Sequence, residues 1–152
     1  MKLLNQFRTF YRQCIWLSII VVGISSCKME EIAALESVKN IQGSWQITKA
    51  TRNGTDITNK FDFTLFRVIF NDDGSYQIQN SLPFIVSTNG SYALDDPQYP
   101  FHIQFTETES ERAVGSGFDY PIVGEGRILT LTFSAGCSSN MYSYMLEKTN
   151  NP

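Results

Sequence analysis

The sequence predicts an all-β fold, an eight-stranded antiparallel up-and-down barrel. Short runs of alternating apolar and polar residues recur through residues 41–149, and turn residues separate them. After residue 40, no apolar pattern of helical period runs longer than two turns. Consecutive hairpins favour the up-and-down order, because neighbours in sequence then pair directly. A two-layered β-sandwich fits the same spacing and stays open at this point.

The first four candidate strands carry the clearest turn signals. Residues 45–51 alternate before Asn53-Gly54, a dipeptide typical of tight turns. Residues 65–70 and 75–79 are β-rich and flank a loop that ends in Asp73-Gly74, which predicts a hairpin. Residues 89–94 follow, and Asp95-Asp96-Pro97 breaks the chain after them.

Four further candidates complete the set. Residues 101–106 alternate, with Phe101, Ile103 and Phe105 on one face and His102 on the other. A glycine-broken stretch comes next, and residues 118–122 indicate a short edge-like strand. The last two candidates are residues 127–133 and 141–147.

The alternation also predicts the barrel interior. If Trp45 points inward, the period of two places Ile47 inside as well. Tyr142 and Tyr144 share one face of the last strand, and Met141, Ser143 and Met145 share the other, so one of these two sets looks inward. The other expected interior residues are Tyr76, Ile78, Tyr92, Leu94, Phe101, Ile103, Phe105, Leu129, Leu131 and Phe133.

Residues 1–26 are expected to be a lipoprotein signal peptide. Their opening is basic with no acidic residue, and residues 15–24 form an apolar run shorter than the roughly 20 residues that span a bilayer. Ile24-Ser25-Ser26-Cys27 resembles the bacterial lipobox. That resemblance implies cleavage before Cys27, acylation of Cys27 and a membrane anchor of several fatty chains. A secretory signal that is cut nearby, with Cys27 incidental, is the alternative.

Residues 27–40 are expected to form a lipidated tether. Ile32, Leu35 and Val38 recur every third residue, which suits one or two turns of helix. The acidic stretch 28–31 resembles the surface-export signal of Bacteroidota lipoproteins. This resemblance implies the outer membrane, with display on the cell surface, while a plain exposed tether is the alternative.

Charge and cysteine content narrow the classes of partner. Without residues 1–26, nine Lys and Arg would stand against fifteen Asp and Glu, a formal charge of −6, which argues against a nucleic-acid surface. Only Cys137 would then remain as a free thiol, so no intramolecular disulfide is expected. Cys137 lies in a turn of small residues with no histidine near it in sequence, and we interpret it as an idle rather than a reactive thiol.

Gly43-x-Trp45 is similar to the signature of lipocalins and the wider calycin superfamily. In that family the tryptophan seals the closed end of an eight-stranded barrel, beneath a basic side chain near the last strand. The resemblance, which is closest to small lipocalin-like lipoproteins of Bacteroidota, implies such a barrel over residues 41–149. Gly43 and Trp45 would be its structural plug, with Lys148 or Arg127 as the basic partner. Neither the Thr-Asp-Tyr motif nor a fatty-acid-binding Arg-Tyr pair occurs, so the resemblance does not define the ligand.

No pattern indicates catalysis, a metal or a cofactor. His102 is the only histidine, a zinc site needs more ligands than this, and no Gly-x-Ser-x-Gly motif occurs. We interpret the acidic residues of turns as solvated carboxylates, and the glutamates of one strand end as a solvated edge that discourages sheet pairing. They are Asp72, Asp73, Asp95, Asp96, Glu107, Glu109 and Glu111.

Aromatic residues make up 13% of the chain, and tyrosine suits sugars, sterols and protein partners. We therefore expect a non-catalytic cell-envelope lipoprotein that binds a small apolar or amphipathic ligand, or a glycan fragment, inside the barrel. The alternative is an envelope protein–protein interaction module with a filled barrel. A cavity of ~300 Å³ or more would favour the ligand. The candidate ligand-binding residues are Tyr76, Tyr92, Phe105, Phe118, Tyr120, Tyr142 and Tyr144.

Overall fold

A computed structural model describes residues 37–82, 85–137 and 139–149. The chain divides into two units, Met1–Leu35 and Glu36–Pro152, and all described residues belong to the second. The expected signal peptide, Cys27 and most of the expected tether with its helical turns lie outside the described residues. Residues 37–40 have no regular secondary structure. No helix within the described ranges is long and apolar enough to cross a membrane.

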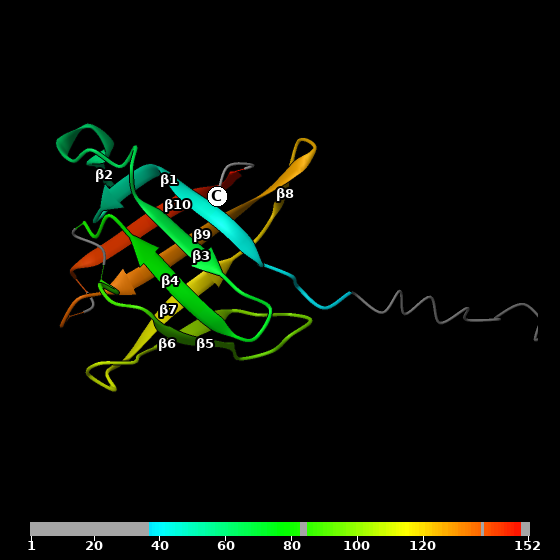
Figure 1. The fold of residues 1–152 in the computed structure, drawn as a ribbon. Helices are drawn as coiled ribbons and strands as arrows, with labels where there is room; N and C mark the ends of the chain where they lie inside the picture. Colours follow the sequence, from blue (N-terminus) through cyan, green and yellow to red (C-terminus); the bar gives the residue numbers. More distant parts are fainter. Residues whose placement is uncertain (1–36, 83–84, 138, 150–152) are drawn as a thin grey trace, which may run out of the picture. The chain divides into compact units, whose positions relative to one another are not determined.

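The second unit is a closed antiparallel barrel (Figure 1). Each wall strand pairs with the next along the chain, and the last returns to pair with the first. Because no wall strand is left without two neighbours, the sandwich alternative is excluded and the predicted eight-stranded up-and-down barrel is confirmed. The wall strands are β1 (Gly43–Arg52), β3 (Arg67–Phe70), β4 (Ser75–Gln79), β5 (Gly90–Leu94), β6 (His102–Glu107), β7 (Ala113–Asp119), β9 (Gly126–Ser134) and β10 (Met141–Thr149).

Three short elements lie outside this wall. The strand β2 (Thr55–Asp56) pairs with the end of β1, and a 3-10 turn, η1 (Thr58–Lys60), follows it. The strand β8 (Ile122–Val123) pairs with the start of β9, so residues 122–127 form a hairpin. Both predicted turns are present. Asn53 and Gly54 have φ values of 49° and 78°, as a type I′ turn requires, and Gly74 has a φ of 81° between β3 and β4.

A β-bulge at Thr48 changes which residues of β1 point inward. Ile47 pairs with Leu146 and Lys49 with Met145, so Thr48 is the extra residue. Trp45 and Ile47 are buried before the bulge, as the period of two predicts. After the bulge the inward position moves by one residue, and Ala50 is the next buried side chain of the strand.

Side chains fill the interior of the barrel. The ring of Phe105 lies 5.1 Å from that of Tyr76, 6.1 Å from that of Phe133 and 6.2 Å from that of Phe70, measured between centroids. Most of the predicted interior residues are buried, and Ile78, Tyr92 and Leu94 are half-buried at its margin. The end of the barrel remote from Gly43 is covered by three buried side chains, those of Phe63, Phe66 and Val86.

Two predicted side-chain positions are wrong. Phe101 is 71% exposed, because β6 begins only at His102 and Phe101 lies beyond the end of the wall, where no opposite strand covers it. Glu107 is buried and 4% exposed, because it ends β6 on the same face as the buried Ile103 and Phe105. Ser110 Oγ donates to the Glu107 carboxylate at 2.8 Å, and this bond is the main reason why the pKa of Glu107 lies below its ordinary value.

The prediction for the glycine-broken stretch after residue 106 is also wrong. Residues 113–119 form β7, a full wall strand that pairs with β6 and β9. The predicted short strand over residues 118–122 is therefore split between the end of β7 and the separate β8. A Cβ at Gly117 would meet the Thr132 side chain at 3.5 Å, an ordinary contact, so this strand position does not require glycine. Its Ser116 and Phe118 neighbours face inward and are buried.

Candidate functional site

At the end of the barrel where β1 begins, three rows of inward-facing side chains continue beyond the buried core. The row of β7 continues in Tyr120, the row of β9 begins with Arg127, and the row of β10 continues in Lys148. These three side chains come together around Trp45 of β1, on ordinary strand alternation alone. The site at this end thus combines Trp45, near the start of the described chain, with three residues from its last third.

Trp45 is fully buried and binds the lead-in segment, by which we mean residues 37–42 before β1. Its indole Nε1 donates to the carbonyl oxygen of Ile41 at 2.7 Å. The Tyr120 ring meets the indole edge-on at 5.9 Å between centroids, and the Tyr120 hydroxyl donates to the carbonyl oxygen of Asn40 at 3.0 Å. Burial raises the pKa of Tyr120, so its hydroxyl stays a donor at neutral pH. Residues 40 and 41 are therefore bound to the end of the barrel.

The rings of Trp45 and Tyr120 each have a cation of their own. Lys148 Nζ lies 6.0 Å from the Trp45 ring centroid, while the Arg127 guanidinium carbon lies 5.0 Å from that of Tyr120. Arg127 Nη1 also donates to the Tyr120 carbonyl oxygen at 2.8 Å. Of the two basic partners that the lipocalin resemblance allowed, Lys148 is therefore the one that lies on the tryptophan.

Gly43 leaves room for this lysine. Its φ is 121°, in the region that side chains rarely adopt, and a Cβ there would lie 2.5 Å from Lys148 Cε. Glycine at this position therefore permits both the local backbone conformation and the seat of Lys148 above Trp45.

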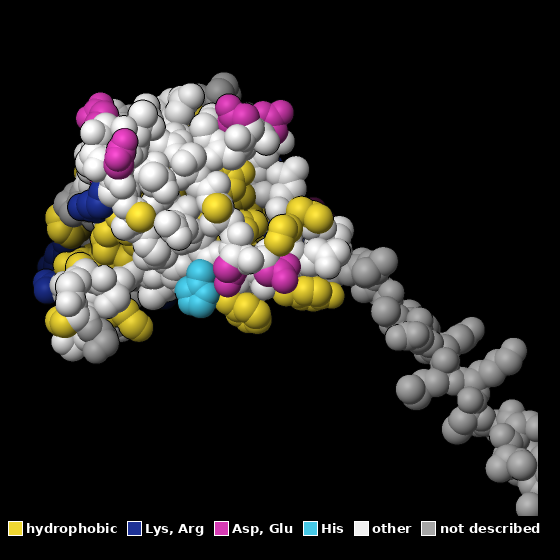
Figure 2. Space-filling view, turned by 90° about the horizontal axis from the view of Figure 1, so that it is seen from below, with side chains coloured by type: hydrophobic (Ala, Val, Ile, Leu, Met, Phe, Trp, Pro, Cys, Tyr) yellow, Lys and Arg dark blue, Asp and Glu magenta, His cyan; other side chains and the backbone are white. Residues whose placement is uncertain are grey.

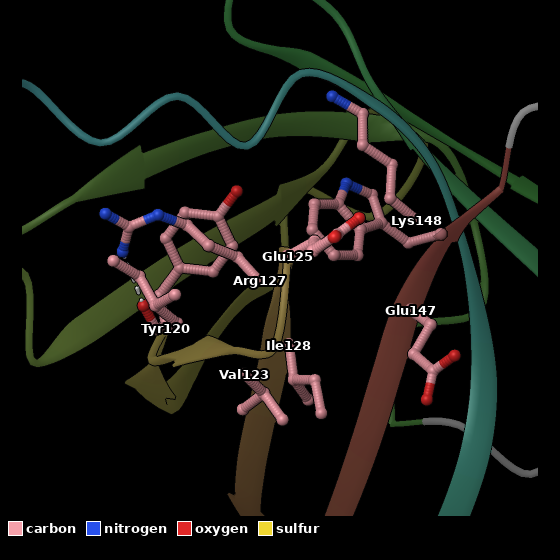
Figure 3. A pocket seen from close by; sticks show the side chains of 10 residues that line it. Tyr120, Val123, Glu125, Arg127, Ile128, Glu147 and Lys148 are labelled. Carbon is pink, nitrogen blue, oxygen red and sulfur yellow. Dashed lines mark hydrogen bonds between the residues drawn. The ribbon is translucent and has the colours of Figure 1, made fainter.

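An open cleft of about 640 Å³ lies beside this end, between the β8–β9 hairpin and the adjoining ends of β1 and β10 (Figure 3). We call it the Trp45 cleft. Figure 3 shows Arg127 and Lys148 on opposite sides of it, with Glu125 between them in that view. It is lined by Trp45, Tyr120, Ile122, Val123, Glu125, Gly126, Arg127, Ile128, Glu147 and Lys148.

The cleft offers an apolar lip and charges of both signs. Ile122 and Val123 are 68% and 52% exposed, whereas Trp45 forms a floor with no exposed surface of its own. Arg127 and Lys148 are balanced formally by Glu125 and Glu147. Within the described part of the chain, neither of these two cations forms an ion pair. The chemistry therefore suits a ligand with an apolar part and a polar or anionic part, and the volume falls within the ~300–1,000 Å³ typical of small-molecule sites.

The seven aromatic residues predicted to bind a ligand do not share one site. Tyr76, Phe105, Phe118 and Tyr144 are buried, and burial raises the pKa of Tyr76 and Tyr144 to about 12. Tyr144 stacks on the half-buried Tyr142 at a ring distance of 6.4 Å, so the tyrosine set of β10 is the inward one.

Two of the seven lie toward the Gly43 end. Tyr92 is half-buried, with its hydroxyl donating to the Asn71 carbonyl oxygen at 3.1 Å. Only Tyr120 lines the Trp45 cleft.

Sequence reasoning missed the β8–β9 hairpin as part of a site. Gly124, with a φ of 62°, lies in the turn that lets Ile122 and Val123 pair back onto β9. A usable signal was the length of the β9 pattern. Only Thr130, Leu131 and Thr132 of this nine-residue strand pair with β7, and its first two residues pair with β8 instead.

Residues 25–147 match the model of a family described as Domain of unknown function (DUF5004). The chain therefore belongs to the DUF5004 family. The matched range covers every strand except the last two residues of β10. No curated protein and no solved structure matches the chain. For this DUF5004 protein, the eight-stranded barrel is consistent with a lipocalin-like fold, and the description of the family assigns no activity.

Proposed function

We propose that this protein is a non-catalytic, lipid-anchored protein of the bacterial cell envelope that binds a small amphipathic ligand, or a glycan fragment, in the Trp45 cleft. The cleft itself carries the proposal, because it combines an apolar lip, two cations without ion pairs among the described residues and sufficient volume. The seat of Lys148 above Trp45, beside Gly43, supports membership of the lipocalin-like lipoproteins of Bacteroidota.

The cleft replaces the barrel interior as the proposed binding place. Phe105 and the three rings around it occupy the space in which a lipocalin-type ligand would lie. A ligand there would have to displace packed rings, which costs about 3–5 kcal/mol for each large aromatic side chain removed. The open cleft requires no such displacement.

The anchor is proposed at Cys27, in the outer membrane and with the barrel displayed on the cell surface. The lipobox-like residues 24–27 and the acidic stretch 28–31 support it. We expect Cys27→Ala to abolish acylation and to release the protein from the membrane fraction. Membrane association equal to that of the wild type, without acylation, would contradict this part of the proposal.

The ligand proposal is tested by native mass spectrometry of the protein purified from membranes of its own host. We expect a co-purified small molecule on the wild-type protein. Val123→Glu places a third carboxylate at the cleft and should reduce the bound fraction at least about tenfold, because it replaces an apolar contact of the lip worth about 1.5–3 kcal/mol and repels an anionic ligand group. The matched control is Met141→Glu, at an apolar residue that is 45% exposed in another part of the barrel. Equal ligand occupancy in the two variants would refute the cleft as the binding site.

The filled interior favours a second candidate, an envelope interaction module without a small ligand. It predicts a wild-type protein that carries no co-purified molecule. It also predicts that in-cell cross-linking from residue 123 joins the protein to one defined envelope partner, whereas cross-linking from residue 141 does not. The two candidates therefore differ in what contacts the β8–β9 hairpin: a small molecule in the first and a protein in the second.

A further inference from the structure

Exposed apolar side chains gather at the end of the barrel where the described chain begins. Eight large hydrophobic residues are exposed in the described ranges, and five of them belong to segments of this end. We call these five the tether-side rim: Val38, Tyr99, Phe101, Ile122 and Val123. Figure 2 shows hydrophobic side chains beside His102 and neighbouring carboxylates on one side of this end. The other three, Phe61, Leu65 and Met141, lie in other segments of the barrel.

Hydrogen bonds of the lead-in segment bring the rim residues to one end. Lys39 N donates to the carbonyl oxygen of Pro97 at 2.8 Å, which places Val38 beside the loop that carries Tyr99 and Phe101. The bond from the Tyr120 hydroxyl to Asn40 places the same segment beside the residues that lead into β8. The rim therefore comes from three segments, residues 37–42, 95–101 and 120–125, that surround the point where the chain enters the barrel.

We propose that the tether-side rim rests on the lipid headgroup layer, so that the barrel stands on the membrane by this end. The inference rests on the anchor proposed at Cys27. Ten residue steps separate Cys27 from Ser37, and a fully extended chain of that length reaches at most about 35 Å. An acylated Cys27 therefore confines the rim to the neighbourhood of the bilayer, where exposed aromatic and aliphatic side chains gain from transfer into the interface.

The charges at this end select the kind of lipid surface. Asp95, Asp96 and Glu125 are exposed and lie in the loops that carry the rim. Lys39, Arg127 and Lys148 of the same end offset these three negative charges formally, so this end carries no positive excess that would draw it to the negative surface potential of anionic lipids. The occupant that fits is a zwitterionic headgroup layer, with the aromatic rings of Tyr99 and Phe101 at headgroup depth, as is usual for interfacial aromatic residues.

The test uses the full acylated protein in phosphatidylcholine vesicles that carry a nitroxide on the headgroup. A fluorescent thiol probe is attached at Gln98→Cys in a Cys137→Ser background. The control is the same probe on the native Cys137, an exposed thiol in the turn between β9 and β10. That turn is at the opposite end of the wall strands, more than about 20 Å from the rim.

We expect nitroxide quenching at residue 98 to exceed that at residue 137 by about fivefold or more, because contact quenching is restricted to the interfacial layer. Adding Phe101→Ser and Ile122→Ser should remove most of that excess while the fraction of protein bound to vesicles stays unchanged, since the acyl chains hold it. Acylated protein that shows equal quenching at the two positions would overturn the docking alone. Protein that carries no lipid and does not float with the vesicles would overturn both the docking and the anchor.

Discussion

Phe105→Ala tests whether the barrel is filled, on which the location of the binding site depends. The side chain is fully buried and lies within 5.1–6.2 Å, between ring centroids, of Tyr76, Phe133 and Phe70. Truncation removes a whole aromatic ring and its three ring contacts, and leaves a cavity that the surrounding rigid wall cannot close. Substitutions of this kind cost about 3–5 kcal/mol, a large part of the roughly 5–15 kcal/mol that stabilises a domain.

The measurement is equilibrium urea unfolding of the chain that begins after Cys27, followed by far-ultraviolet circular dichroism. We expect the free energy of unfolding to fall by about 3–5 kcal/mol with an unchanged m value, and the melting temperature to fall by about 10–20 °C. Phe101→Ala is the matched control, because this residue of the same segment is 71% exposed and should change stability by less than about 0.5 kcal/mol. A loss below about 1 kcal/mol for Phe105→Ala would refute the packed interior and return the ligand to the barrel.

Three further outcomes are expected. Trp45→Phe removes the indole hydrogen bond and should lower the free energy of unfolding by about 2 kcal/mol in the same assay. Gly43→Ala introduces a strained φ and a clash with Lys148, so it should cost about 1–3 kcal/mol and expose the indole, seen as a red shift of its fluorescence. The backbone N–H of His102 is the first of several donors that hold the pKa of Asp95 at about 2. Since the unfolded carboxyl titrates near 3.9, the contribution of Asp95 is present above about pH 4 and is lost as the pH falls toward 2. The amide NMR shift of residue 102 should follow that titration, and Asp95→Asn should abolish it.

Strand order was predictable because it depends on local signals. The alternation of residues 75–79 gives the bounds of β4 as the structure has them, and the Asp73-Gly74 turn joins β4 to β3. Turn residues with left-handed φ, such as Gly54, Gly74 and Gly124, mark reversals of the chain. In a meander, a correct list of reversals is also a correct list of neighbours, so the topology follows from the turns.

Side-chain positions near strand ends were not predictable in the same way. Phe101, just before β6, and Glu107, at the end of β6, belong to one alternating row, yet the first is exposed and the second is buried. Alternation assigns both to the inner face, but burial also needs an opposite wall at that height, which depends on how far the other strands extend. The bulge at Thr48 adds a second limit, since one unpaired residue reverses the assignment of every position after it.

The candidate site could be predicted in part. The lipocalin resemblance places Gly43, Trp45 and a basic side chain together, and it left Lys148 and Arg127 as alternatives. Deciding between them needs the crossing of β9 and β10 beside β1, which the sequence does not reveal. The apolar lip at Ile122 and Val123 gives still less signal, because two residues outside the wall are too short a run to show any period.

The side chains that continue the inward rows beyond the core explain why a filled barrel can still bind a ligand at its end. Tyr120, Arg127 and Lys148 extend rows whose inner members, such as Leu129 and Leu146, are buried and apolar. Each has an apolar stem that covers the end of the core and a polar tip that can stay in water. Leucine at these positions would seal the end equally well, so the polar tips are not required for closure alone. Their presence around an open cleft is what a polar or charged ligand group requires. If the tether-side rim rests on the bilayer, that cleft opens at headgroup level, where an amphipathic ligand can enter directly from the membrane.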